Sequence, residues 1–129
     1  MKVITGFVFY GDREQKKRPA VVFAEIDGWV AVIPLTSHFD REPVVHDGDV
    51  ILSSHSTAYA GTGLGNGAKV STLRVKDAAI YSVKSFWMRE VKVIGDLDLK
   101  SDLRFRAQFE KALKDFPIVK VVDWQPVGA

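Results

Sequence analysis

The chain has 129 residues, of which 47% are hydrophobic and 26% are charged, with a formal net charge of +2 at pH 7. These values fit one domain over 1–129 with a sizeable core and an extension at 117–129, and they permit a polyanionic partner without requiring one. The absence of cysteine excludes disulfides and thiol nucleophiles and fits a reducing compartment such as the cytoplasm. No apolar run approaches the roughly 20 residues of a membrane span, and Met1–Gly6 does not predict a signal peptide.

The first part of the chain predicts strands. Gly6 marks a bulge or a close contact within the first of them. Residues 11–17 contain no apolar side chain and predict a loop, after which Pro19 is expected to start the next strand. Asp27-Gly28 predicts a hairpin turn between two β-rich runs. Strands are expected over residues 3–10, 20–25, 29–35, 49–52, 68–73, 78–84, 86–94 and 118–124.

The remaining segments predict two irregular stretches and one helix. Residues 36–47 are mostly polar and predict a loop, and the segment 53–67, rich in Gly, Ser and Thr, predicts an irregular connection. A helix is expected over 101–116, with Ser101 as its N-cap. Apolar residues at helical spacing form one stripe along it: Phe105, Phe109, Ala112, Leu113 and Phe116. The sequence therefore predicts a mainly β protein, a small, strongly bent antiparallel sheet or barrel with a C-terminal helix.

Arg18 is the first candidate site residue. Arg13, Lys16 and Lys17 stand close before it, so four cations occur within six residues and form a candidate anion-binding segment. A guanidinium can donate two parallel hydrogen bonds to one phosphate group. It can also stabilise the negative charge that develops on this group in a transition state. The structural alternative is an ordinary surface arginine at the start of a strand.

Thr36, Ser37 and His38 are the second candidate group. An antiparallel pair formed by the two segments that Asp27-Gly28 joins would bring Arg18 and Thr36 to the same end. A hydroxyl can bond a phosphate oxygen, and a histidine with a pKa near 6.5 can transfer a proton. The alternatives are turn chemistry for the hydroxyls and a solvated ring for the histidine.

Other kinds of site find little support in the sequence. His38, His46 and His55 are eight and nine residues apart, which matches no compact metal-ligand motif, so no metal and no cofactor are expected. The segment Gly61–Gly67 has glycine at alternate positions and precedes no helix, which favours a flexible connection over a phosphate loop. No G-x-S-x-G motif occurs in the sequence.

Three segments resemble a known family. Arg18-Pro19-Ala20-Val21-Val22 resembles the signature of the MazF/PemK toxins of toxin–antitoxin modules. Ile33-Pro34-Leu35-Thr36-Ser37 is similar to that family's strand end, and Val91–Leu97, before the helix, is similar to its closing segment. The resemblance covers about residues 3–116 and implies an SH3-like barrel of the CcdB/MazF type, usually a homodimer.

The resemblance also implies an activity. MazF-like toxins are endoribonucleases that cleave single-stranded RNA without a metal. The ribose 2′-OH attacks the adjacent phosphate, which leaves a 2′,3′-cyclic phosphate and a 5′-OH end. By position, Arg18 and Thr36 would carry the chemistry, Ser37 and His38 would be auxiliary, and Arg13, Lys16 and Lys17 would bind RNA. A cognate antitoxin would cover the site with an acidic segment.

Two other functions remain open on the sequence. One is a non-enzymatic poison of the same fold that binds a protein such as DNA gyrase, as the related CcdB toxins do, in which case the segment 117–129 matters most. The other is a binding module that has kept the fold and lost the activity. The first would lose toxicity without residues 117–129, whereas a ribonuclease would keep its cleavage.

Overall fold

The computed structural model describes residues 1–10, 14–38, 45–65, 70–87 and 91–122. Within these residues, eight strands form one curved sheet in which β4, β5, β3, β2, β1 and β7 are neighbours in that order, and β6 and β8 extend it from β3. The strands are β1 (Lys2–Tyr10), β2 (Glu14–Ile26), β3 (Trp29–His38), β4 (Asp49–Ser53), β5 (Val70–Arg74), β6 (Ala79–Ser82), β7 (Lys92–Asp96) and β8 (Lys120–Val122).

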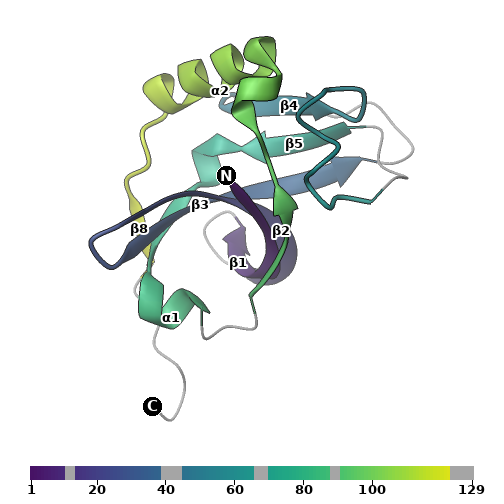
Figure 1. Cartoon of the computed structure of the whole chain (residues 1–129). Helices are drawn as coiled ribbons and strands as arrows, with labels where there is room; N and C mark the ends of the chain where they lie inside the picture. The colour runs from purple at the N-terminus through teal and green to yellow at the C-terminus, as the bar shows by residue number, and fades with distance from the viewer. Residues whose placement is uncertain (11–13, 39–44, 66–69, 88–90, 123–129) are drawn as a thin grey trace.

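Two α-helices lie at different ends of this sheet. The helix α2 (Leu103–Asp115) lies over β4 and β5, and the short helix α1 (Val83–Trp87) lies at the opposite end, beneath the curl of β1 and β2 (Figure 1). Two 3₁₀ turns, η1 (Val75–Asp77) and η2 (Leu99–Ser101), connect the elements. The prediction of a mainly β, barrel-like protein with a C-terminal helix is confirmed. None of the helices in the described ranges is long and apolar enough to cross a membrane.

Both faces of the sheet are covered, because alternate residues of its strands belong to two separate apolar clusters. The helix-side cluster joins Val21, Ile33 and Leu35 of the sheet to Phe105 and Phe109 of α2. The Phe86 cluster gathers the strand residues of the other face around Phe86 of α1: Ile4, Ala20, Val22, Val30, Val32, Ala79 and Tyr81. Each face of β2 and β3 therefore meets a different environment.

The β2–β3 hairpin follows the predicted turn. Asp27 and Gly28 have φ angles of 50° and 83°, the left-handed conformations that such a turn requires. The two central strands are longer than the sequence indicated. Residues 14–17 were expected in a loop, but they lie in β2 and pair with β1. Thr36–His38 were also expected in a loop, but they lie in β3 because β5 continues the ladder there.

Pro19 lies inside β2 rather than at its start, opposite Thr5. The prediction was wrong because the last residue pair between β2 and β3 is Ala20–Pro34, so β3 has already left the ladder at Pro19. A proline fits there because no neighbour on that side needs its missing N–H.

Residues 83–87 form a helix where strands over 78–84 and 86–94 were expected. Val83 and Phe86, three residues apart, both pack into the Phe86 cluster, so a helical turn buries them together. The strand that follows, β7, begins only at Lys92. The predicted final strand is confirmed over Lys120–Val122, where β8 runs parallel to β6. The last two residues of the predicted strand, 123 and 124, lie outside the described residues.

The predicted C-terminal helix and its apolar stripe are confirmed. Phe105, Phe109 and Ala112 are buried, and Leu113 and Phe116 are partly buried against the same cluster. The N-cap is Asp102 rather than Ser101, because the Asp102 carboxylate accepts a hydrogen bond from the Phe105 N–H at 3.0 Å. Ser101 belongs to the preceding 3₁₀ turn.

The glycine-rich segment is irregular as expected, but its described part is more than a flexible connection. It packs backbone to backbone against β7, where the Asp96 N–H donates to the carbonyl of Gly61 at 2.8 Å. A Cβ on Gly63, whose φ is +71°, would lie 2.0 Å from the Ile94 carbonyl oxygen. A Cβ on Gly95 would lie 2.3 Å from the carbonyl carbon and oxygen of Thr62. Glycine is therefore required at both positions, because any side chain there would clash with the neighbouring backbone.

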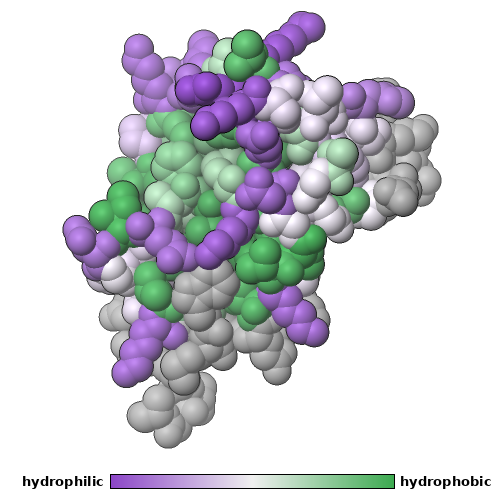
Figure 2. All heavy atoms as spheres, viewed as in Figure 1, coloured by the Kyte–Doolittle hydropathy of each residue, from purple (hydrophilic) through white to green (hydrophobic). Residues whose placement is uncertain are grey.

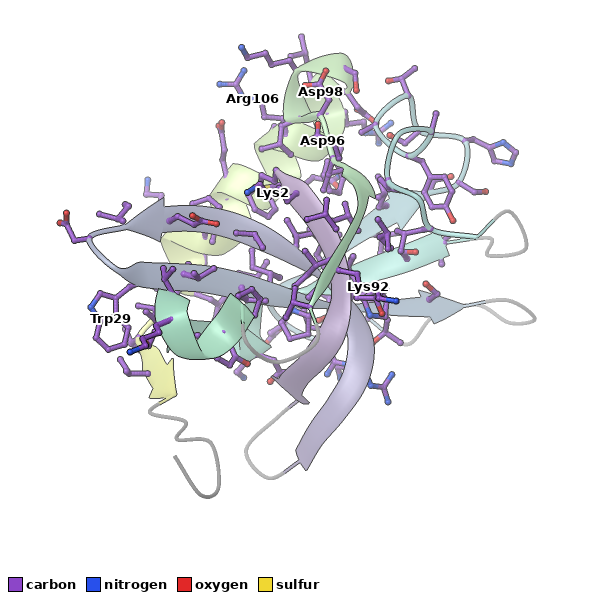
Figure 3. All side chains as sticks on the ribbon, turned by 60° about the horizontal axis from the view of Figure 1, so that its bottom comes forward. Lys2, Trp29, Lys92, Asp96, Asp98 and Arg106 are labelled. Atoms are coloured by element: carbon purple, nitrogen blue, oxygen red, sulfur yellow. The ribbon has the colours of Figure 1, made fainter. Side chains whose placement is uncertain are left out.

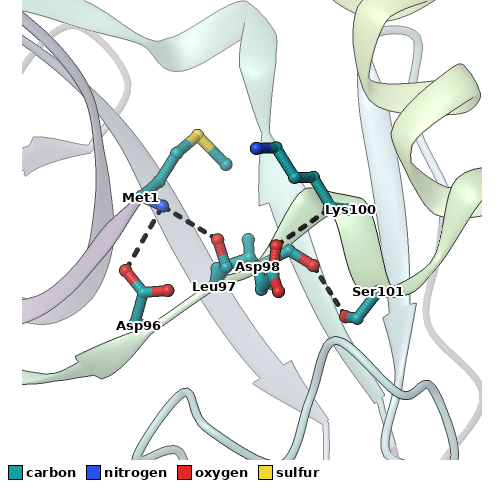
Figure 4. A network of polar contacts seen from close by, with 6 residues as sticks. All are labelled: Met1, Asp96, Leu97, Asp98, Lys100 and Ser101. Carbon is teal, nitrogen blue, oxygen red and sulfur yellow. Dashed lines mark hydrogen bonds and ion pairs between the residues drawn. The ribbon is translucent and has the colours of Figure 1, made fainter.

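Met1, the first residue, contacts the end of β7 and the residue that follows it. The α-amino group of Met1 donates to the Leu97 carbonyl at 2.8 Å and lies 3.4 Å from an Asp96 carboxylate oxygen (Figure 4). The Leu97 N–H donates back to the Met1 carbonyl at 2.8 Å. The Asp98 carboxylate accepts from the Lys100 N–H at 3.0 Å. These bonds fix the passage from β7 to α2.

Replacing Gly95 with alanine should lower the free energy of unfolding by about 2 kcal/mol or more, because the new methyl group meets backbone atoms that cannot move aside. Gly65→Ala is the matched control, since a Cβ there has nothing within 4 Å. It should change stability by no more than about 0.5 kcal/mol. Urea unfolding followed by circular dichroism measures both, and equal losses in the two variants would contradict the contact.

Acid should weaken the cap of α2. The Ser56 hydroxyl, which donates to Asp102 at 2.5 Å, and the Phe105 N–H lower the pKa of Asp102 below its usual 3.8. A lowered folded-state pKa stabilises the fold above the unfolded value, and the effect is lost as the pH falls through the folded value. Ser56→Ala should therefore unfold at a lower temperature than the wild type at pH 7.

The difference in Tm between Ser56→Ala and the wild type should shrink as the pH falls below the usual carboxyl pKa of 3.8, because Asp102 becomes protonated on the way down. Ser54→Ala, a neighbouring serine outside this pair, serves as the control and should show a Tm difference that is independent of pH. Thermal unfolding from pH 2 to 7 measures these differences. A constant gap for Ser56→Ala across this range would contradict the role of the carboxylate.

Candidate functional site

Arg18 lies in β2 directly opposite Gly6 of β1. Val91 fills the space that a side chain at Gly6 would occupy, with its Cγ2 3.1 Å from the position of the missing Cβ. The prediction of a close contact at Gly6 is thus confirmed. Arg18 is half-buried and its Nε atom is buried, so the stem of the side chain is held against the protein.

Thr36 lies in β3 and shares a face with Arg18. Side chains alternate along a strand, so Arg18 lies on the same face as Ala20, and Thr36 on the same face as Pro34. Ala20 and Pro34 form the last pair of the β2–β3 ladder. Arg18 and Thr36 are each two residues, or about 7 Å along the strand, beyond that pair. They lie just beyond the end of the β2–β3 ladder, on the face that carries the Phe86 cluster.

Beyond Pro34, β3 pairs with β5, and this brings Thr72 directly opposite Thr36. Thr72 is 1% exposed, whereas Thr36 is half-buried. Thr72 is not among the candidate residues that the sequence indicated. Ser71-Thr72 is a visible pair of hydroxyls inside a predicted strand, but only the pairing of β3 with β5 reveals that it faces Thr36 and Ser37.

Ser37 lies on the other face of β3, with Leu35. Its Oγ is 3.2 Å from the Oγ of Ser71, which is fully buried. The structure therefore brings Arg18 and Thr36 to one face and turns Ser37 towards the helix-side cluster. The two neighbouring hydroxyl pairs of β3 and β5, Thr36–Thr72 and Ser37–Ser71, point to opposite sides of the sheet.

The other predicted residues are described only in part. His38 lies in β3 opposite Val70, and its side chain lies outside the described part of the structure. The same holds for the side chains of Lys16 and Lys17, whose backbone belongs to β2. Arg13 lies outside the described residues. Their roles stay predictions.

A charged cluster that the sequence analysis missed joins β4 to the turn after β5. Arg74 Nε lies 3.1 Å from Asp49 Oδ1, and Arg74 Nη2 lies 3.5 Å from Asp77 Oδ2. The side chain of Asp49 is 2% exposed, and its Oδ2 accepts from the His46 N–H at 2.9 Å. These groups satisfy one another, so the cluster has a structural role.

A separate pocket of about 530 Å³ lies between β4 and the start of α2. Its lining carboxylates are occupied, Asp49 by Arg74 and Asp102 by Ser56 and the helix N-terminus. Arg18 and Thr36 do not line it. Across the described ranges, no group of three or more His, Asp or Glu side chains is placed to hold a metal ion.

The shared face of Arg18 and Thr36 is suited to an anion. A guanidinium offers five N–H donors in a fixed plane, and a threonine hydroxyl can donate and accept. Both stand beside an apolar cluster, where electrostatic interactions are stronger than in water. A phosphate on this face, just beyond the end of the β2–β3 ladder, would meet positive charge from one strand and a hydroxyl from the other.

Comparisons with known proteins agree with this fold. The sequence matches no protein-family model and no curated protein. The structure is similar to the crystal structure of MazF from Deinococcus radiodurans, with a TM-score of 0.50 and 13% sequence identity over 88% of this chain and 94% of that chain. At that identity the likeness shows the fold alone, and this chain has a MazF-like fold.

Proposed function

We propose that this protein is a toxin-type endoribonuclease that cleaves single-stranded RNA. The observation that carries the proposal is the position of Arg18 and Thr36, which lie on one face of the sheet, on two neighbouring strands, just beyond the Ala20–Pro34 pair that ends their ladder. The MazF-like fold supports the same reaction class. RNA supplies its own nucleophile, so positioning and charge stabilisation are the main requirements of such a site.

In the proposed reaction, the 2′ oxygen forms a bond to the adjacent phosphorus while the bond from phosphorus to the 5′ oxygen breaks. The 2′-OH gives up its proton and the leaving oxygen takes one, which yields a 2′,3′-cyclic phosphate and a 5′-OH end. Arg18 stabilises the charge on the non-bridging oxygens, and Thr36 bonds the same phosphate. His38, two residues after Thr36, is proposed as an auxiliary acid or base.

The basic segment before Arg18 would bind the RNA backbone. Lys16 and Lys17 immediately precede Arg18 in β2, and Arg13 stands just before this strand. Contacts of this kind are independent of sequence and weaken with salt, because binding releases counterions. The same cations would attract the acidic segment of a cognate antitoxin, which would then block the RNA site in the cytoplasm.

A second copy of the chain is the other proposed partner. Large apolar side chains stay exposed on the described surface, among them Ile26 (65%), Trp29 (45%) and Val121 (58%). Apolar patches lie between charged side chains on the face shown in Figure 2. Exposed apolar surface favours association. Sedimentation equilibrium should therefore give twice the chain mass of 14.4 kDa, and a monomer at micromolar concentration would contradict the homodimer.

Cleavage of RNA provides the direct test. Incubation with a long single-stranded RNA in EDTA should produce 2′,3′-cyclic phosphate and 5′-OH ends. Arg18→Ala should lower kcat by about 10²- to 10³-fold, the usual cost of losing a group that stabilises charge in the transition state. Thr36→Val should lower it by about 10-fold or more, because one phosphate contact is lost.

Arg106→Ala is the matched control for charge. Arg106 lies on α2, where it is exposed and pairs with Glu110 at 2.9 Å (Figure 3). Its loss removes the same formal charge from a surface ion pair of little energetic weight, so kcat should stay within about two-fold. The proposal fails if the wild type leaves the RNA intact, or if Arg18→Ala and Arg106→Ala cleave it equally fast.

A further inference from the structure

The pocket between β4 and the start of α2 has the size and the lining of a ligand site. Its volume of about 530 Å³ lies within the range of pockets that hold small organic molecules. Part of its wall is apolar and is formed by Val45, Ile51 and Phe105. Polar side chains from both elements complete the wall, among them His55, Arg104 and Gln108. An apolar wall with a few polar groups is typical of sites for organic ligands.

The polar groups of this pocket suit a nucleobase. His55, Arg104 and Gln108 are all exposed where they line it. An imidazole ring and a guanidinium plane can stack on an unpaired base, and a side-chain amide can donate to and accept from the base edge. Two carboxylates also line the pocket, Asp49 and Asp102. Their negative charge disfavours a phosphate, so an uncharged base is the better ligand.

The pocket adjoins the sheet face that carries Arg18 and Thr36. Ile51, in its wall, is the β4 partner of Thr72, and Thr72 is the β5 partner of Thr36. Direct partners in a ladder lie on one face, so Ile51 shares the face of Thr36. Two strand spacings separate Ile51 from Thr36, or about 10 Å. Thr72 is 1% exposed between them, so the pocket is a separate hollow beside the proposed catalytic residues.

We propose that this pocket, called the β4–α2 pocket, binds one unstacked base of the substrate RNA close to the phosphate that Arg18 and Thr36 hold. The Gln108 amide bonds the base edge, and His55 and Arg104 lie against the ring. Stacking tolerates any base, whereas an amide with one donor side and one acceptor side distinguishes among bases. The pocket therefore sets the preferred base at one position of the cleavage sequence. This inference rests on the proposed function for its effect on cleavage, but binding of a base needs no reaction.

The sequences that the protein cleaves test the pocket in the active enzyme. Sequencing of the ends produced from a random RNA pool should show a preferred base at one position near the cleaved bond. Gln108→Ala should lower kcat/KM by about 10-fold on RNA with this base and much less on RNA with another base there, since one base contact is lost. Arg106→Ala is the control, because Arg106 lies on the same helix but does not line the pocket. It should keep the full preference.

Binding without cleavage decides the inference independently of the reaction. A short 2′-deoxy oligonucleotide lacks the attacking hydroxyl and stays intact. It should shift the NMR amide signals of Ile51, His55 and Gln108, and so should an uncharged nucleoside, whereas inorganic phosphate should not. Gln108→Ala should raise the Kd of the oligonucleotide by about 10-fold, and Arg106→Ala by about two-fold or less.

The inference is overturned if the oligonucleotide shifts only signals outside the pocket, or if Gln108→Ala and Arg106→Ala bind it equally tightly. It is also overturned if inorganic phosphate shifts the pocket signals and the nucleoside does not. A wild type that binds the oligonucleotide in the pocket but leaves RNA intact overturns the proposed function instead, and the base site then stands.

Discussion

The end of the β2–β3 ladder at Pro34 is the feature on which the candidate site depends. From Trp29 to Pro34 one edge of β3 pairs with β2, and the other edge pairs with β6 over Trp29–Val32 and with β5 from Leu35 onward. A proline closes the first ladder and another stands in β2 just beyond it, so neither strand offers an N–H there to prolong the pairing. Arg18 and Thr36 lie just beyond this end of the ladder, on the same face of the sheet.

The two faces of the sheet explain why only some of the hydroxyls near this end of the ladder are available for chemistry. Period-two alternation sends Thr36 and Ser37 to different sides. Ser37 meets buried Ser71 beside the helix-side cluster, whereas Thr36 remains half-buried at the margin of the Phe86 cluster. The helix α2 anchors the first face and α1 the second. The candidate site thus takes its rigidity from a sheet that is packed on both sides.

Local sequence signals predicted the parts that depend on neighbours along the chain. The turn at Asp27-Gly28 and the apolar stripe of α2 need no knowledge of the fold. The predictions that were wrong concern elements that form through contacts between residues far apart in sequence. Residues 14–17 form a strand only because β1 pairs with them, and Thr36–His38 only because β5 does. The helix at 83–87 forms because Val83 and Phe86 reach one cluster together.

The same distinction applies to the site. The resemblance marked Arg18 and Thr36, and the structure places them on one face, but Thr72 carries no signal of its own. A serine–threonine pair inside a strand is common, and its meaning comes from the residue that faces it. The glycine-rich segment shows the converse. Gly63, which was expected in a flexible connection, is fixed by a backbone contact with Ile94 of β7, and Gly95 of β7 is fixed by a backbone contact with Thr62. Residue type suggested the chemistry at Arg18 and the flexibility at Gly63, and contacts between distant segments decide which of these properties the folded protein has.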